Sequence, residues 1–320
     1  MVREGCTQTE AALACGVSQG RLSEYLRGLW PAGNGPSLRR FEAECREIVR
    51  RAYRGLSRDA RIRARFPCRV VFLDDLHVPF TDSSVVEEVV RREAGADYLV
   101  TFEVATFDAF SRFDQTYLDE PAAEQTLAAR LLTELAGHFG EVVCGTSNHM
   151  DRPEKGIVRN LRPEQQEYVL ANLRDVYAAI REAGIRHVAS PFIQIGDAIF
   201  AHFDRTLGTP GATPQELLKR VRSHHDVYGL SADPAACFTG HTHRVAQVPM
   251  EGGKGYLYEV GCGTYLPPYV LRSTRGGKIR NYRMACGYGV AVFDSRGRID
   301  LTESRAVHLG WARLPDAAGR

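Results

Sequence analysis

The residues of this sequence best suited to chemistry are aspartate, asparagine and histidine side chains that occur in four short groups. In the first group a histidine follows an aspartate by two residues. In the fourth group, two histidines have this same spacing, and the glycine beside them permits close approach of the backbone. In extended backbone, residues two apart project to the same side, so each pair can hold one ion. Carboxylate, amide and imidazole groups all bind divalent metals. The groups are Asp75-Leu76-His77, Asn148-His149, His202 and Gly240-His241-Thr242-His243.

The elements that must position these groups are predicted strands, each of which ends at or just before one group. From residue 69 onward, strand patterns alternate with helical patterns, and open α/β folds place their sites at the carboxyl ends of strands. We therefore expect the four groups to meet. The predicted strands are 70–73, 97–102, 141–145, 192–195, 198–202, 236–239, 256–260 and a hairpin of 288–293 with 299–303, and the predicted helices are 83–94, 121–139 and 163–183.

The order of the four groups resembles the signature of the calcineurin-like metallophosphoesterases, over residues 69 to about 305. The resemblance implies an α/β fold in which a two-layer β-sandwich is flanked by helices. It also implies two divalent ions (Mn, Fe, Zn, Ni or Mg) that hydrolyse a phosphomonoester or phosphodiester substrate. The ligands that it implies are Asp75, His77 and His243 for one ion, and Asn148, His202 and His241 for the other.

Two motifs of the family have a changed form here. The family's second motif is Gly-Asp-x-x-Asp, whose first aspartate bridges the ions, and the matching stretch is Phe102-Glu103-Val104-Ala105-Thr106. Glu103 keeps the carboxylate and is the expected bridge. The third motif of the family reads Gly-Asn-His-Asp/Glu, and the matching stretch has two residues inserted after Gly145 and Met150 before the acid. In this motif, His149 is expected beside the leaving group as an acid or electrostatic stabiliser. Asp151 is expected to orient His149, and Arg152 to pair with a phosphate oxygen.

A separate unit is expected at residues 1–66, before a phosphoesterase domain at 67–320. Residues 8–27 resemble the helix-turn-helix of DNA-binding proteins, so we expect a small all-α unit that binds nucleic acid. Residues 1–69 carry a net charge of +7 and the remainder −5, which suits contact with a polyanion. The alternative is a helical hairpin that packs on the main domain. The predicted nucleic-acid-binding residues are Gln19, Arg21, Ser23 and Arg27.

Composition limits the class of protein. The chain has 320 residues, of which 44% are hydrophobic and 25% charged, which excludes a disordered, collagen-like or small disulfide-rich protein. No apolar run approaches the roughly 18 residues of a membrane span, and the start lacks the apolar core of a secretory signal. Eight cysteines occur singly, as expected of reduced thiols in a cytoplasmic protein.

The leading hypothesis is a cytoplasmic, metal-dependent phosphoesterase of the phosphodiesterase or nuclease type, directed to nucleic acid by its amino-terminal unit. Two alternatives stay open. One is a DNA-binding protein whose phosphoesterase domain has lost turnover through the change at Glu103. The other is a phosphomonoesterase for a small metabolite, with amino-terminal helices that serve oligomerisation.

Overall fold

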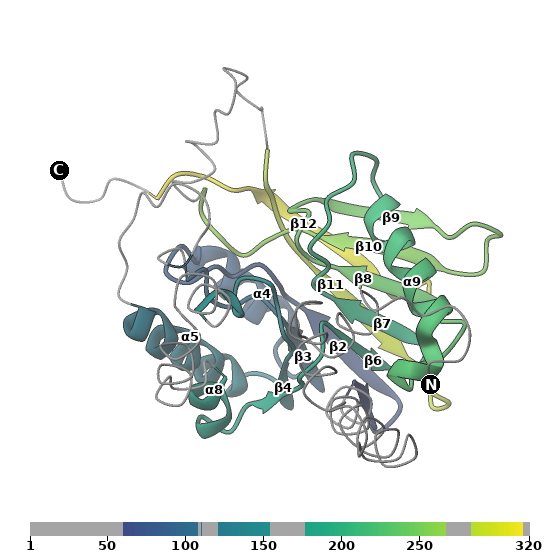
Figure 1. Cartoon of the computed structure of the whole chain (residues 1–320), viewed down its shortest axis with the longest axis horizontal. Helices are drawn as coiled ribbons and strands as arrows, with labels where there is room; N and C mark the ends of the chain where they lie inside the picture. Colours follow the sequence, from purple (N-terminus) through teal and green to yellow (C-terminus); the bar gives the residue numbers. More distant parts are fainter. Residues whose placement is uncertain (1–59, 108–109, 111–120, 154–176, 267–282, 316–320) are drawn as a thin grey trace, which may run out of the picture. The chain divides into compact units, whose positions relative to one another are not determined.

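The computed structural model describes residues 60–107, 110, 121–153, 177–266 and 283–315 (Figure 1). The chain divides into two compact units between Arg58 and Asp59, whereas the sequence placed the boundary after residue 66. The first unit lies outside the described residues, and with it the predicted helix-turn-helix. The nucleic-acid-binding assignments of Gln19, Arg21, Ser23 and Arg27 therefore stay predictions.

One sheet of the second unit, called here sheet I, has the strand order β12-β11-β2-β3-β4-β5 in the described residues. Its strands from β2 to β5 run parallel, and β11 pairs antiparallel with both β2 and β12. Parallel neighbours bring the carboxyl ends of β2, β3 and β4 to the same edge. The strands are β2 (Cys68–Phe72), β3 (Tyr98–Thr101), β4 (Glu141–Cys144), β5 (Arg186–His187), β11 (Ala285–Phe293) and β12 (Arg305–Trp311).

The other sheet, sheet II, has the order β1-β6-β7-β8-β10-β9 in the described residues. Within it, β7 runs parallel to β8 and β8 to β10, while β6 pairs antiparallel with β7 and β9 with β10. The strands are β1 (Arg61–Ile62), β6 (Phe192–Ile195), β7 (Ala198–Ala201), β8 (Ala236–Thr239), β9 (Val245–Pro249) and β10 (Tyr256–Val260).

The two sheets pack face to face, with helices on their outer faces (Figure 1). Strand β2 shows why: Val70 and Phe72 point into the core that both sheets share, and Val71, between them, points toward the helices of sheet I. Alternate side chains of a strand face opposite sides, so a strand buried on both faces is apolar throughout. The helices are α4 (Ser83–Glu93), α5 (Pro121–Ala136) and α8 (Ala178–Glu182) on sheet I, and α9 (Ala212–Tyr228) on sheet II.

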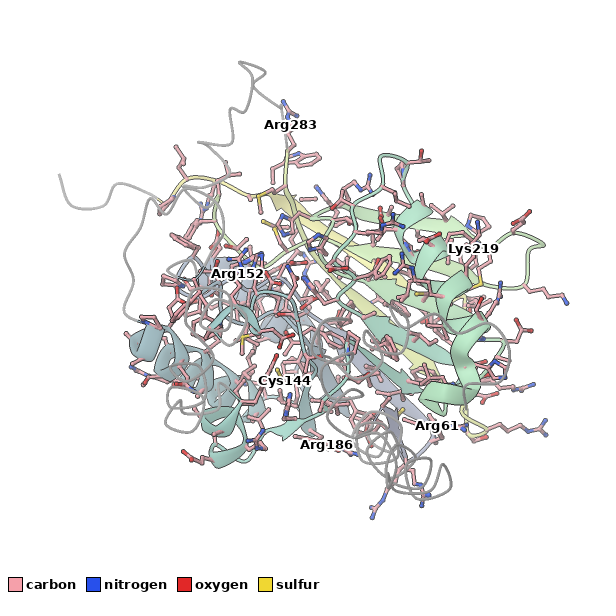
Figure 2. All side chains as sticks on the ribbon, viewed as in Figure 1. Arg61, Cys144, Arg152, Arg186, Lys219 and Arg283 are labelled. Atoms are coloured by element: carbon pink, nitrogen blue, oxygen red, sulfur yellow. The ribbon has the colours of Figure 1, made fainter. Side chains whose placement is uncertain are left out.

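This arrangement confirms the predicted mixed α/β fold with two sheets flanked by helices. Charged side chains such as Arg61, Arg186 and Lys219 lie outside, whereas Cys144 at the end of β4 is buried (Figure 2). Among the described residues, no helix has the length and apolar character needed to cross a membrane.

Several elements differ from the sequence prediction. Helix α9 was missed because its buried side chains, Leu217, Leu218 and Val221, form a narrow stripe in an otherwise charged and polar segment. The predicted strand 299–303 was wrong. Ile299 makes only an isolated bridge to Phe293, and Asp300 accepts hydrogen bonds from the backbone of the next residues, so the chain turns there before β12. The first part of the predicted helix 163–183 lies outside the described residues.

Candidate metal centre

The predicted metal ligands come together at the carboxyl ends of five strands. Asp75 follows β2, Glu103 follows β3 and Asn148 follows β4, all in sheet I. His202 follows β7 and His241 follows β8, both in sheet II. Ion-pair and hydrogen-bond contacts join residues from both sheets, so the site lies where the two sheets meet at this edge.

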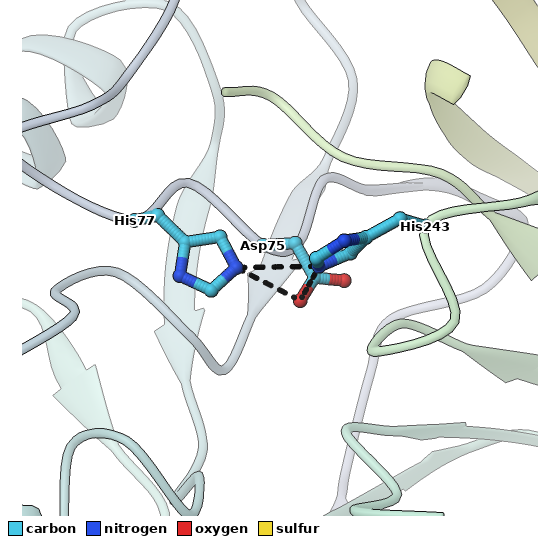
Figure 3. Close-up of side chains that lie close together, drawn as sticks. All are labelled: Asp75, His77 and His243. Atoms are coloured by element: carbon cyan, nitrogen blue, oxygen red, sulfur yellow. Dashed lines mark hydrogen bonds and ion pairs between the residues drawn. The ribbon is translucent and has the colours of Figure 1, made fainter. Parts of the chain in front are cut away.

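The first cluster contains Asp75, His77 and His243 (Figure 3). The Nε2 atoms of the two histidines are 3.3 Å apart, and Oδ1 of Asp75 lies 3.2 Å from His243 Nε2 and 3.5 Å from His77 Nε2. Atoms that bind one ion at about 2.1 Å lie roughly 3.0 to 3.4 Å from each other. The three atoms therefore have the spacing of ligands around a single divalent ion.

The second cluster surrounds Nε2 of His202. This nitrogen lies 2.9 Å from Oε2 of Glu103, 3.0 Å from Oδ1 of Asn148 and 3.2 Å from Nδ1 of His241. Carboxylate and amide oxygens are acceptors that carry no proton of their own. Their convergence on one imidazole nitrogen requires either a hydrogen on that nitrogen or a metal ion among them, and the donor set of oxygen and nitrogen atoms suits a divalent metal.

Glu103 joins the two clusters. While its Oε2 faces His202, its Oε1 lies 2.9 Å from Nδ1 of His77 and also contacts Nδ1 of His149. Nδ1 of His77 is the nitrogen opposite the one that faces Asp75 and His243. The carboxylate is fully buried, and neither oxygen has an aligned hydrogen bond to any residue described. Its two oxygens therefore connect a histidine of the first cluster with a histidine of the second, and its role as a bridge between two ions stays a prediction.

The electrostatics of the clusters favour bound positive charge. Burial alone would raise the pKa of Glu103 and of Asp75, but the histidines around them hold both well below their ordinary values. Burial likewise opposes protonation of His77, yet the charge of Glu103 raises the pKa of His77 to about 9. The pKa of His202 is also raised against burial, by Glu103 and then Asp74. Without metal, protons therefore neutralise these acids, and a metal ion must displace them.

Two other histidines of the site, His149 and His241, have lowered pKa values and are therefore neutral over a wider pH range than His77 and His202. Burial, together with a smaller effect of the nearby His202, lowers the pKa of His241 to about 4. Burial also lowers the pKa of His149 to about 3, although Glu103 opposes the shift. Neutral imidazole is the form that binds a metal.

The backbone of the paired groups is not extended, contrary to the sequence argument. Asp75, His77, His241 and His243 have φ values of 52°, 49°, 71° and 49°, in the left-handed region that side chains other than glycine rarely adopt. Phe107 is the one other such residue in the part of the chain described. Backbone strain of this kind concentrates at functional sites. Left-handed turns, rather than a pleated strand, direct Asp75 and His77 to the first cluster. They divide the other pair, with His243 in the first cluster and His241 in the second.

The backbone at Gly240 lies close to neighbouring side chains, as expected from the sequence. A Cβ atom at this position would lie 2.1 Å from Oδ2 of Asp74 and 2.9 Å from Oδ2 of Asp75. The backbone N–H of the next residue, His241, donates to Oδ2 of Asp75 at 2.6 Å. A side chain at 240 would therefore push the loop of the paired histidines away from the acids after β2.

Sequence reasoning missed Asp74, the acid directly before Asp75. It is fully buried, and its Oδ2 lies 3.0 Å from Nδ1 of His202. The sequence gives one signal for it: two acids in succession follow a buried strand. Because burial of even one charge is costly, a second acid at such a position indicates a function.

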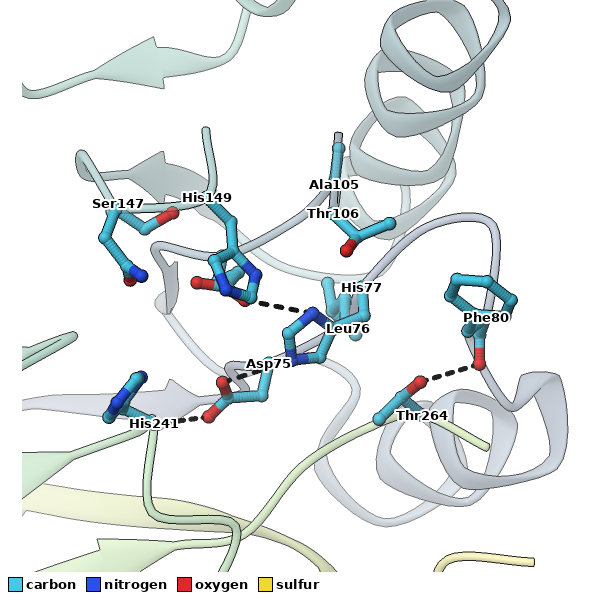
Figure 4. A network of polar contacts seen from close by, with 12 residues as sticks. Asp75, Leu76, His77, Phe80, Ala105, Thr106, Ser147, His149, His241 and Thr264 are labelled. Atoms are coloured by element: carbon cyan, nitrogen blue, oxygen red, sulfur yellow. Dashed lines mark hydrogen bonds and ion pairs between the residues drawn. The ribbon is translucent and has the colours of Figure 1, made fainter. Parts of the chain in front are cut away.

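The three residues expected to act on the substrate lie beside the clusters. His149 points toward His77, with ring centroids 5.2 Å apart (Figure 4). Asp151 accepts a hydrogen bond from the hydroxyl of Tyr177 at 3.0 Å, and the contact that orients His149 comes from Glu103. Arg152 donates to the backbone oxygen of Thr106 at 2.7 Å. The roles assigned to His149, Asp151 and Arg152 stay predictions.

A pocket of about 610 Å³ opens beside the second cluster. Asn148 and His202 form part of its wall, so a molecule in the pocket would touch that cluster directly. Apolar side chains form another part of the lining, and they come from the start of β6, from the segment after β7 and from α9. The apolar lining residues are Pro191, Phe192, Phe203, Leu217 and Val221, and the polar ones also include Asp151, Asp204 and Arg220.

No protein-family model matches the chain, and no curated protein is similar to it in sequence. Among solved structures, a hypothetical protein from Pyrococcus horikoshii is 8% identical, with 78% of this chain and 89% of that chain covered and a TM-score of 0.40. A single mutant of Vps29 from Entamoeba histolytica is 11% identical, with 76% and 99% covered and a TM-score of 0.36. A predicted phosphoesterase from Streptococcus pneumoniae is 14% identical, with 75% and 97% covered and a TM-score of 0.29.

Proposed function

We propose that this protein is a metal-dependent hydrolase of phosphoester bonds. The observation that carries the proposal is the convergence of two sets of metal-ligand atoms, which Glu103 joins by contacts to His77 and His202. Chance would not bring acids and imidazoles from five strand ends to ligand spacing in the buried, strained geometry described above. A pair of cation sites side by side suits a reaction in which charge develops on two oxygens of one phosphorus.

In this proposal the residues of the two clusters hold one divalent ion each. Asp75, His77 and His243 bind the first ion, and Asn148, His202 and His241 bind the second. Glu103 supplies the charge between them. When bound, such ions polarise phosphoryl oxygens and lower the pKa of water so that it becomes a nucleophile at neutral pH.

The chain's other residues orient the substrate. His149 lies against Glu103 at the edge of the clusters. Of the two roles predicted from the sequence, we propose that it stabilises the leaving group, because its lowered pKa of about 3 leaves it without the proton that a general acid must give up at neutral pH. The pocket beside Asn148 and His202 is proposed to hold the organic group of the phosphoester, because its apolar wall excludes water from one side of that group. The lining of the pocket includes Arg220, whose guanidinium lies 5.1 Å from the ring of Phe203.

We further propose that the substrate is a phosphodiester of nucleic acid. This part rests on the basic charge of residues 1–69 and on the motif at residues 8–27. If several arginines contact phosphates, affinity for a DNA duplex must fall steeply with salt, because each contact releases a counterion. Binding that is absent or independent of salt between 50 and 200 mM would remove nucleic acid from the proposal.

The test of the hydrolase is turnover of bis(4-nitrophenyl) phosphate by the purified protein with Mn²⁺. His241→Ala removes one ligand of the second cluster and is expected to abolish turnover. His138→Ala is the matched control, because His138 is an exposed histidine at the end of the α5 region and is expected to leave turnover unchanged. Wild-type protein that binds metal but turns over no phosphoester would favour the alternative of a DNA-binding protein whose phosphoesterase domain has lost turnover. Turnover that survives His241→Ala would refute the proposed site.

A further inference from the structure

Asp74 is a buried acid beside the second cluster, and its two oxygens contact different parts of that cluster. Its Oδ1 accepts two backbone N–H groups, from Phe102 at 3.0 Å and from Glu103 at 2.8 Å. Its Oδ2 lies 3.0 Å from Nδ1 of His202. One carboxylate therefore fixes the backbone from which Glu103 projects and, at the same time, the ring of His202.

The contact with His202 decides which nitrogen of that ring carries a proton. A carboxylate accepts hydrogen bonds and donates none, so Nδ1 of His202 must be the donor. In the neutral ring, Nε2 then has the free lone pair, and Nε2 is the nitrogen that Glu103 and Asn148 face. A carboxylate behind a metal-binding histidine fixes the tautomer and orients the ring in this way in many metal sites.

The surroundings hold Asp74 in this position. A Cβ atom on Gly240 would meet Oδ2 of Asp74 at 2.1 Å, so this glycine leaves space for the carboxylate behind the loop of the paired histidines. Asp74 and His202 are both buried, with relative exposures of 0% and 3%. Their contact is therefore shielded from water, and exchange with solvent groups does not compete with it.

We propose that Asp74 is a positioning residue for the second cluster: it acts through His202 by holding the Nδ1–H tautomer and thereby directs Nε2 at the ion. The inference rests on the proposed metal sites but not on the proposed hydrolysis. It predicts that one of the two ions depends on Asp74 and that the ion bound by Asp75, His77 and His243 does not.

The test uses Asp74→Asn in the full-length protein. The Asn oxygen can still accept from Phe102 and Glu103, but its NH₂ group donates toward Nδ1 of His202 and so favours the wrong tautomer. Zn²⁺ affinity is measured by competition with a chelator. We expect the affinity for one of the two bound ions to fall by roughly 10- to 100-fold and the affinity for the other to change by less than about twofold. Asp197→Asn is the matched control, because Asp197 also accepts a backbone N–H, from Ile299 at 2.7 Å, and lies outside both clusters.

A double-mutant cycle separates positioning from a purely structural role. In a His202→Ala background, Asp74→Asn is expected to change Zn²⁺ affinity by less than about twofold, because the residue through which Asp74 acts is gone. The same loss in both backgrounds would overturn the proposal, as would unchanged Zn²⁺ binding by Asp74→Asn or a wild-type protein that binds no Zn²⁺.

A measurement on the wild-type protein keeps the proposal testable if Asp74→Asn does not fold. Nitrogen-15 NMR of the zinc-loaded protein, with the His202 ring assigned, is expected to show a proton on Nδ1 and the metal on Nε2. The reverse arrangement would overturn the proposal. If zinc binds in this way but no phosphoester is hydrolysed, the role of Asp74 stands and the proposed function fails.

Discussion

Oε2 of Glu103 lies 2.9 Å from Nε2 of His202, so an acid that follows β3 of sheet I meets a histidine that follows β7 of sheet II. This contact crosses between the sheets at the edge where their strands end. The other oxygen of the same carboxylate faces His77. Because one side chain reaches both clusters, its length is as important as its charge.

Shortening this side chain is expected to separate the clusters. Glu103→Asp removes one methylene and retracts the carboxylate from His77, His202 or both. A displacement of about 1 Å at a reacting site can cost roughly 100-fold in rate, so we expect turnover of the aryl phosphodiester to fall by about that factor and Zn²⁺ stoichiometry to decrease. Glu141→Asp, at an exposed acid of β4 that pairs with Arg186, is the control. Full activity of Glu103→Asp would show that Glu103 does not join the two sites.

The metal-free protein is expected to lose stability as pH rises from about 6.5 to 9. His77 has its pKa raised from 6.5 to about 9 in the folded state, by Glu103 against the effect of burial. The folded protein therefore holds this proton more tightly than the unfolded chain. The resulting stabilisation is complete below 6.5 and is lost as pH rises through 9.

Urea unfolding of the metal-free protein at several pH values measures this effect. Buried thiols such as Cys144, whose pKa burial raises, also weaken stability at high pH, so the comparison is with His77→Gln, in which the thiols are unchanged. The difference in free energy of unfolding between the wild-type protein and His77→Gln is expected to shrink from pH 6.5 to 9. A difference independent of pH would contradict the assigned protonation of His77. Metal affinity should rise over the same range, because the ion displaces this proton.

A methyl group at Gly240 is expected to disrupt the site. In Gly240→Ala the Cβ atom would overlap Oδ2 of Asp74, and overpacking of this kind typically costs about 1–3 kcal/mol. We expect a lower free energy of unfolding and weaker binding of the second ion. Gly208→Ala is the control, since nothing lies within 4 Å of a Cβ at that position and its φ is ordinary. Equal stability and metal affinity in both variants would show that the loop can move without cost.

The packing of α9 on sheet II gives a stability prediction independent of metal. Leu218 is completely buried against that sheet, whereas Leu127 of α5 is 44% exposed. Leu218→Ala is expected to lower the free energy of unfolding by about 2–5 kcal/mol, and Leu127→Ala to change it by less than about 1 kcal/mol. Similar losses in the two variants would argue against the docking of α9 described here.

Many strands of the two sheets could be predicted because they carry a local signal. Residues 70–73 are an apolar run between Arg69 and Asp74, residues 235–238 are an apolar run between Pro234 and Thr239, and the structure places β2 and β8 over these runs. Helix α9 and strand β12 lack such a signal. The apolar stripe of α9 is narrow, and β12 has a mixed burial pattern that becomes readable only beside β11.

The available ligand types and the strand ends at which they occur could be predicted from the sequence, because both are properties of short stretches of chain. Which atoms of those residues face each other became known only from the folded chain. It placed Glu103 between His77 and His202, set Asp74 behind His202, and put Asp75 and His243 in left-handed turns. These relationships depend on how the two sheets pack, and contacts between residues on different strands, far apart along the chain, leave no local pattern in the sequence.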